Sequence, residues 1–211
     1  MLEIGRLCEA KEYLAQKRVV IFDMDDTLYP EKDYVRSGYA AVAQHYPKIA
    51  NMADKLWHAF ECGKQAINFV LEQEGLLSDE SIRECLEVYR NHFPEIKLYS
   101  EASQLLQFLK ENGTHLGLIT DGRPEGQRAK IEALGLEPYF EKIIITDELG
   151  GVEFRKPNKA AFEIMQKHFG VPFETMVYVG DNQKKDFIAP RQLGMDSVYF
   201  KNPDGLYSEG V

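Results

Sequence analysis

Residues 19–28 read Val-Val-Ile-Phe-Asp-Met-Asp-Asp-Thr-Leu, a short apolar run that stops at the carboxylate of Asp23. Such a run of four apolar residues, three of them β-branched, is typical of a strand buried on both faces. Similar short runs follow at 116–119, 143–145, 176–179 and 197–200. Helical patterns separate these later runs and end at glycines, and Asn158 is a candidate N-cap. The alternation predicts an α/β fold, a doubly wound, Rossmann-like parallel sheet with helices on both faces.

The sequence separation between the first two predicted strands is much larger than the separations between the later strands. The later runs start 21 to 33 residues apart, whereas 97 residues separate positions 19 and 116. A strand–helix–strand unit needs only about 30 residues. The excess has helical periodicity in three runs, which begin at Val35, Met52 and Ile82. We therefore predict an inserted helical bundle at residues 31–94, with residues 1–30 and 95–211 forming the α/β core.

Carboxylates follow two of the predicted strands. Asp23 and Asp25 stand at i and i+2, so in an extended chain they share one face. Asp181 follows the run at 176–179, and Asp186 comes five residues later. Each could instead cap a turn or helix. A cluster of such acids would repel by about 4 kcal/mol per pair at 4 Å, which calls for a cation, and oxygen ligands favour Mg²⁺.

Two further segments could bind an anion. Thr120, Asp121 and Gly122 follow the run at 116–119 and offer a hydroxyl and backbone N–H groups, although the same residues form ordinary turns. Lys156 precedes a predicted helix N-terminus, where a lysine gains nothing from the helix dipole. It could hold an anion or be a surface lysine with a buried stem.

Composition limits the classes of partner. The 34 Asp and Glu residues exceed the 25 Lys and Arg residues, which gives a formal net charge of −9. This balance argues against nucleic acid or an anionic membrane as a partner. The N-terminus shows neither a signal peptide nor a membrane span, and three widely spaced cysteines are typical of free thiols. We expect a cytoplasmic protein, either a monomer or a homodimer.

Four segments, taken together and in order, resemble the motifs of the haloacid dehalogenase-like hydrolase superfamily. They are FDMDDTL at 22–28, LITDG at 118–122, RKPNKAAF at 155–162 and VGDNQKKD at 179–186. The resemblance implies the strand order 3-2-1-4-5 and identifies the insertion as a helical cap between the first and second motifs. Two departures are small: Asp26 stands where glycine is frequent, and Lys159 where a second proline is frequent.

The same resemblance implies a role for each matching residue. Asp23 would be the nucleophile that becomes a phosphoaspartate, and Asp25 the acid that protonates the leaving group and later activates water. Lys156 would neutralise the nucleophile and the phosphate. In full, the catalytic residues would be Asp23, Asp25 and Lys156, the substrate phosphate would contact Thr120, Asp121 and Lys156, and the metal would bind Asp23, Asp25 through its carbonyl, Asp181 and Asp186.

These expectations favour a Mg²⁺-dependent phosphatase acting on a small phosphorylated metabolite, such as a sugar phosphate or a nucleoside monophosphate. Asp25 argues against a dehalogenase, because a halide leaving group needs no acid. A phosphomutase of the same superfamily shares every motif and stays open. Two alternatives come from another class: a receiver-type phosphoacceptor domain, and a binding relative without catalytic activity.

Overall fold

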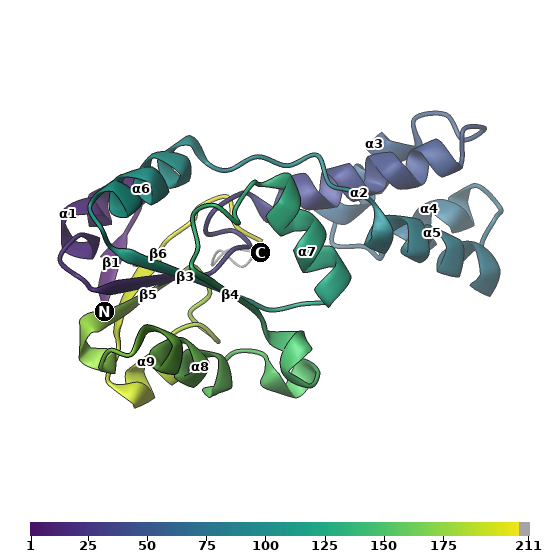
Figure 1. The fold of residues 1–211 in the computed structure, drawn as a ribbon. Coiled ribbons are helices and arrows are strands. Elements are labelled where there is room, and N and C mark those ends of the chain that lie inside the picture. The colour runs from purple at the N-terminus through teal and green to yellow at the C-terminus, as the bar shows by residue number, and fades with distance from the viewer. Residues whose placement is uncertain (207–211) are drawn as a thin grey trace. The chain divides into compact units, whose positions relative to one another are not determined.

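The run at 19–22 forms β2, Val19–Phe22, inside a sheet whose strand pairs are all parallel (Figure 1). The computed structural model describes residues 1–206. The strand order is β1-β6-β5-β2-β3-β4. The bounds are β1 Leu2–Ile4, β3 His115–Thr120, β4 Lys142–Ile145, β5 Met176–Gly180 and β6 Asp196–Phe200. The α/β class is confirmed, with β2 between β3 and β5.

The sheet has one strand more than the sequence analysis predicted. The five predicted strands stand in the order 3-2-1-4-5, and β1 extends the sheet by pairing with β6. The prediction missed β1 because it has only three residues, two of them exposed, at the edge of the sheet. So short a strand carries no periodicity that a sequence could reveal.

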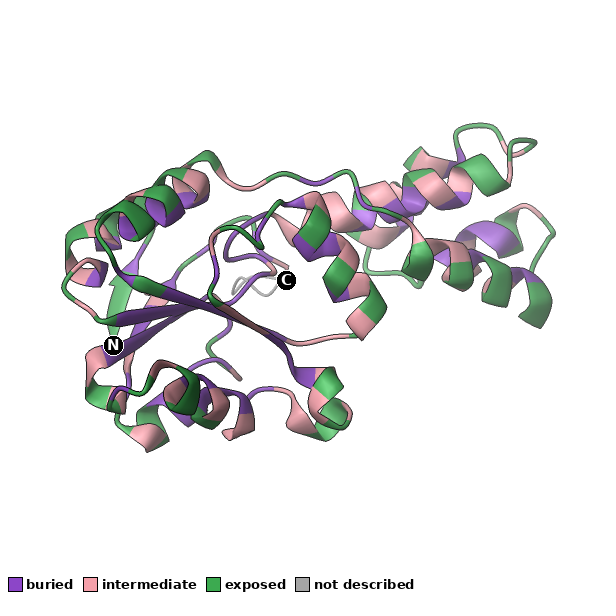
Figure 2. Ribbon diagram, viewed as in Figure 1, coloured by how far each residue is buried: buried purple, intermediate pink, exposed green. Residues whose placement is uncertain are grey.

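Helices cover both faces of the sheet (Figure 1). One face carries α1 (Lys11–Leu14), α6 (Ser100–Glu111) and α7 (Pro124–Ala133), and the other carries α8 (Ala160–Phe169) and α9 (Ile188–Leu193). Figure 2 shows buried residues along the strands and on the inward sides of these helices. Short 3₁₀ turns cover Leu7–Ala10, Thr146–Leu149, Val152–Phe154 and Phe173–Thr175.

The core beneath α8 shows how the sheet and helices hold together. Phe162 of α8 is fully buried and its ring meets that of Tyr178 on β5 edge-on, with 5.2 Å between centroids. The helix begins one residue later than expected: Lys159 occupies the N-cap position, while the Asn158 side chain accepts a hydrogen bond from the Ala160 N–H at 2.9 Å. Asn158 therefore satisfies a free N–H of the first turn without being the N-cap residue.

Most of the segment inserted between β2 and β3 is helical. The chain divides into two compact units, Met1–Glu31 with Lys97–Val211, and Lys32–Ile96. The helices are α2 (Glu31–His45), α3 (Met52–Glu61), α4 (Ala66–Gln73) and α5 (Asp79–Asn91). The predicted helical run that begins at Met52 does not form one helix, because the chain breaks into α3 and α4 at Gly63, which has φ 69°.

Close packing inside this unit depends on a small residue. A Cβ atom at Gly38 of α2 would collide with the ring of Tyr89 on α5. Helix α5 begins with a capping box, in which Ser78 and Ser81 exchange side-chain and backbone hydrogen bonds at 3.0 and 3.1 Å. Across residues 1–206, no helix combines the length and the apolar character needed to cross a membrane.

Candidate active site

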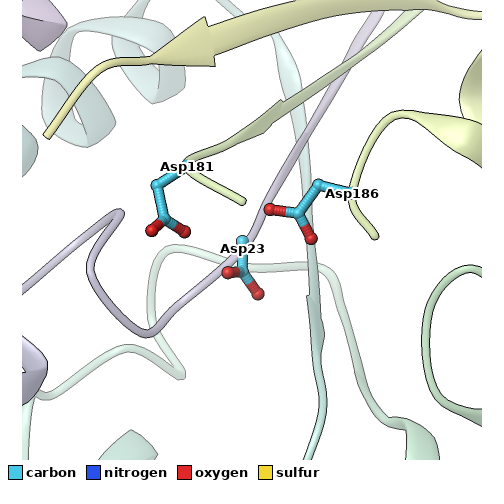
Figure 3. Close-up of side chains that lie close together, drawn as sticks. All are labelled: Asp23, Asp181 and Asp186. Carbon is cyan, nitrogen blue, oxygen red and sulfur yellow. The ribbon is translucent and has the colours of Figure 1, made fainter. Parts of the chain in front are cut away.

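Two neighbouring strands end in the carboxylates that the sequence singled out. Asp23 follows β2, and its N–H continues the sheet by donating to the Val179 carbonyl of β5 at 2.8 Å. Asp181 follows β5, and Asp186 lies in the turn before α9. One carboxylate oxygen from each of Asp23, Asp181 and Asp186 lies within 4.8 Å of the others, and Figure 3 shows the three side chains converging.

Charge repulsion and burial govern this acidic cluster. Burial, opposed by Lys156 and reinforced by Asp186, raises the pKa of Asp23 to about 7. Burial together with the charge of Asp23 raises the pKa of Asp181 to about 9. Oδ1 of Asp186 is buried and faces the Lys156 ammonium at 3.0 Å. Three converging carboxylates fit an oxygen-coordinated divalent cation such as Mg²⁺.

Lys156 pairs with two of these carboxylates. Its ammonium Nζ lies 2.5 Å from Asp23 Oδ1 and 3.0 Å from Asp186 Oδ1, and it donates to the Tyr178 hydroxyl at 2.8 Å. Burial alone lowers the pKa of Lys156, but the charges of Asp186 and Asp23 outweigh burial and raise it. The side chain is fully buried. The surface-lysine alternative is therefore wrong.

The segment after β3 brings Thr120 and Asp121 to the same edge of the sheet. The Thr120 hydroxyl is buried and accepts a hydrogen bond from Gln127 Nε2 at 2.6 Å. The Asp121 carboxylate accepts from the Thr146 hydroxyl at 2.9 Å, from the Lys156 N–H at 3.1 Å and from Lys185 Nζ at 3.1 Å. Asp121 thus ties three segments of this edge together.

Asp25 is surrounded by donors. Its Oδ1 accepts from the Tyr29 hydroxyl at 2.5 Å and from Lys130 Nζ at 2.7 Å, and its Oδ2 accepts from Gln127 Nε2 at 2.9 Å. Burial raises the pKa of Asp25, but the charge and hydrogen bonds of its neighbours, Lys130 first, outweigh burial and lower it. Asp25 therefore rests as a carboxylate.

These side chains open onto a pocket of about 330 Å³. The pocket includes a further carboxyl group, Glu31 at the start of α2, whose pKa is raised to about 8 by burial and by the charge of Asp25. Both acidic and basic side chains line the wall. The lining residues are Asp23, Asp25, Glu31, Asp121, Arg155, Lys156, Asp181, Asn182 and Lys185.

Several contacts were missed by the sequence analysis. Gln127 of α7 is buried and joins Asp25 to Thr120. Its neighbour Arg128 instead forms a surface ion pair with Glu148 at 2.7 Å. The spacing of Gln127 and Lys130 at i and i+3 was the available signal, because such residues share a helix face.

Fold and site together define a doubly wound α/β protein whose sheet carries, at its carboxyl edge, a crevice lined by acids and lysines. The family model described as haloacid dehalogenase-like hydrolase matches residues 20–200. The chain therefore belongs to the haloacid dehalogenase-like hydrolases, and the resemblance read from its motifs is confirmed.

Similar curated proteins are phosphatases by name. The chain is 29% identical over 191 residues to the glyceraldehyde 3-phosphate phosphatase of Methanocaldococcus jannaschii, covering 85% of this chain and 82% of that protein. It is 33% identical over 120 residues to the phosphoserine phosphatase of Thermus thermophilus, covering 57% and 47% of the two chains.

Among solved structures, the fold is similar to that of the putative hydrolase YfnB from Bacillus subtilis, whose crystal structure contains magnesium. The TM-score is 0.64 at 22% identity, with 90% of this chain and 88% of that chain covered.

Proposed function

We propose that this protein is a Mg²⁺-dependent phosphatase that hydrolyses a small phosphorylated metabolite through an aspartyl-phosphate on Asp23. The reaction class, hydrolysis of a phosphoric monoester, follows from family membership and from relatives named as phosphatases. One arrangement of side chains supports the use of Mg²⁺ and of Asp23 as the nucleophile. Three carboxylates meet within 4.8 Å, and the Lys156 ammonium lies 2.5 Å from one of them.

The first step forms a bond between an Asp23 carboxylate oxygen and phosphorus and breaks the bond from phosphorus to the ester oxygen. Asp25 donates a proton to the departing oxygen, so that an alcohol leaves rather than an alkoxide. In the second step, water attacks the phosphorus of the phosphoaspartate while Asp25 takes its proton. Inorganic phosphate leaves, and the Asp23 carboxylate is restored.

Asp25 needs a proton for the first step, although its pKa is lowered in the substrate-free site. A phosphate dianion in the pocket would place negative charge close to Asp25 and raise its pKa, because a like charge disfavours ionisation. Substrate binding and proton uptake by Asp25 are therefore coupled in this account.

Positive charge has to balance the site. Lys156 is held against Asp23, where it would also reach the phosphate oxygens, while the Thr120 hydroxyl would donate to them. The metal residues would be the carboxylates of Asp23, Asp181 and Asp186 and the carbonyl of Asp25. When bound, Mg²⁺ would supply charge that lets the nucleophile and the phosphate approach each other.

The size of the pocket and the names of similar phosphatases both point to a small substrate. The pocket of about 330 Å³ suits a small ester rather than a polymer. The relatives' names include phosphatases of glyceraldehyde 3-phosphate and phosphoserine. We propose that the helical segment at 31–94 is a cap domain that selects the leaving group, as the family resemblance implies.

Phosphate release tests the proposal. We would assay a panel of sugar phosphates, nucleoside monophosphates, phosphoserine, glyceraldehyde 3-phosphate and p-nitrophenyl phosphate, with Mg²⁺ and with chelator. Wild type should release phosphate only with Mg²⁺, and Asp23→Asn should release none. Transfer that needs a bisphosphate activator and gives no net phosphate would indicate the phosphomutase instead. A phosphoprotein that persists for minutes without turnover would indicate the receiver-type alternative.

A further inference from the structure

Asp25 is held by three buried donors that no motif of the sequence predicted. Tyr29, Gln127 and Lys130 are 0%, 3% and 5% exposed. The Asp25 side chain itself is 20% exposed and lines the pocket. The donors therefore approach the carboxylate from the protein side and leave part of it accessible from the pocket.

Lys130 is the most unusual of the three donors. Lysine is almost never fully buried unless it is paired, because desolvating an ammonium is costly. Here the pairing partner lies 105 residues away in the sequence, and the Nζ–Oδ1 distance is 2.7 Å. Lys130 and Gln127 stand one helical turn apart, so α7 presents an ammonium and an amide to the same carboxylate.

The geometry fixes the orientation of the Asp25 carboxylate. Oδ1 accepts from two donors and Oδ2 accepts from Gln127, so rotation of the group would break hydrogen bonds on both oxygens. Gln127 Nε2 also lies 2.6 Å from the Thr120 hydroxyl and 2.7 Å from the Asp121 carbonyl. The orientation of Asp25 is thus tied to the segment that would hold the substrate phosphate.

We propose that Lys130, supported by Tyr29, is a positioning residue that acts through Asp25 and aims its carboxyl at the leaving-group oxygen. The proposal rests on the phosphatase function given above. A displacement of about 1 Å at a reacting group can lower a rate by about a hundredfold. The loss should appear only where the leaving group needs a proton.

A comparison of two substrates can distinguish a positioning role of Lys130 from a general role in holding the fold together. An alkyl phosphate, such as glyceraldehyde 3-phosphate, expels a strongly basic alkoxide and depends on Asp25, whereas p-nitrophenyl phosphate expels a weakly basic phenolate and does not. Both share the nucleophile and the phosphate site. The ratio of their kcat/KM values therefore reports acid assistance during the first step and is insensitive to the amount of folded enzyme.

The experiment compares this ratio in Lys130→Met, Tyr29→Phe and the control Arg128→Met, using the best alkyl phosphate of the panel beside p-nitrophenyl phosphate. Arg128 lies on the same helix but is exposed and pairs with Glu148.

We expect Lys130→Met to lower kcat/KM about 10- to 100-fold for the alkyl ester and less than about threefold for the aryl ester. Arg128→Met should leave the ratio unchanged. Tyr29→Phe, which removes only a hydroxyl, should lower the ratio less, and it keeps the test decisive if Lys130→Met does not fold.

A double-mutant cycle then tests whether Lys130 acts through Asp25. In an Asp25→Asn background, Lys130→Met should change the ratio less than about twofold, because the group it positions is already gone. Equal loss on both substrates, or an undiminished loss in the Asp25→Asn background, would overturn the positioning role while leaving the phosphatase intact. Absence of Mg²⁺-dependent release by wild type from every ester would overturn both proposals.

Discussion

Lys156 Nζ and Asp23 Oδ1 lie 2.5 Å apart, although 133 residues separate the two in sequence, and both side chains are almost completely buried. The pair joins the end of β2 to the loop that precedes α8. A buried ammonium beside the proposed nucleophile offsets part of the negative charge there, and the oxygens of a bound phosphate would meet the same cation.

Replacing Lys156 should affect both activity and stability. Lys156→Met leaves the carboxylates of Asp23 and Asp186 buried without their cation, and breaking a buried pair in this way costs about 3–5 kcal/mol. We expect the free energy of unfolding, measured with urea at pH 8 in chelator, to fall by that amount. Phosphate release should fall at least about a hundredfold.

The control for this substitution is Lys110→Met, because Lys110 is an exposed lysine whose Nζ donates to the Pro138 carbonyl. Surface changes of this kind stay within about 0.5 kcal/mol. A loss below about 1 kcal/mol for Lys156→Met would contradict the buried ion pair.

Binding of Mg²⁺ should release protons. Without a cation the pKa of Asp181 is about 9 and that of Asp23 about 7, so both sites hold protons near neutral pH that a cation must displace. The affinity for Mg²⁺ should therefore rise between pH 6 and 9, by up to about tenfold per pH unit for each proton displaced. Calorimetry in two buffers of different ionisation enthalpy measures the number released.

Asp181→Asn should weaken Mg²⁺ binding and reduce the proton release, whereas Asp79→Asn, at an exposed position on α5, should alter neither. A Mg²⁺ affinity that does not change with pH would contradict the protonated cluster.

The stability of the metal-free protein should fall as pH rises. The pKa of Asp181 and of Asp23 is higher in the folded protein than the ordinary value of 3.8, so the folded state binds more protons between these values. The contribution of these two carboxyl groups to the free energy of unfolding is complete below about pH 4 and is lost as the pH rises toward 9. Melting curves in chelator should show this decline, and saturating Mg²⁺ should remove most of it. A metal-free melting temperature that rises steadily from pH 5 to 9 would argue against it.

Asp26 combines a stabilising side chain with a backbone conformation that favours glycine. It has φ 53°, and its buried carboxylate accepts the N–H groups of Glu31 at 2.9 Å and Leu206 at 2.7 Å. Asp26→Ala loses both hydrogen bonds and keeps a Cβ atom in the left-handed region, so we expect a loss of about 2–4 kcal/mol in urea unfolding. Asp26→Gly should be less destabilising by about 1–2 kcal/mol. Equal losses for the two variants would exclude the backbone contribution.

The sequence predicted those features that local patterns encode. The strand at 19–22 and its neighbours have continuous apolar runs, and Asp23, Asp25 and Asp181 stand where those runs stop. Because parallel strands place their carboxyl ends along one edge, their convergence was predictable in outline. The frequent glycine that Asp26 replaces also has a physical reason, since the position requires positive φ.

Features that depend on packing between distant segments were not predictable. Strand β1, which pairs with β6, has only three residues, too few to show a strand pattern in the sequence. The break at Gly63 separates two helices whose apolar residues follow one continuous helical period. The contact of Lys130 with Asp25 spans 105 residues and depends on how α7 packs on the sheet. A lysine on a helix gives no sign in sequence of whether it is buried.

The central claim is that Asp23 carries the phosphoryl group during turnover. Rapid acid quenching of wild type with p-nitrophenyl phosphate and Mg²⁺, followed by mass spectrometry of the peptides, tests it most directly. The account predicts one added phosphoryl group on the peptide containing Asp23, lost on incubation at neutral pH and absent from Asp23→Asn. Turnover without any phosphorylated peptide, or phosphate attached to another residue, would contradict it.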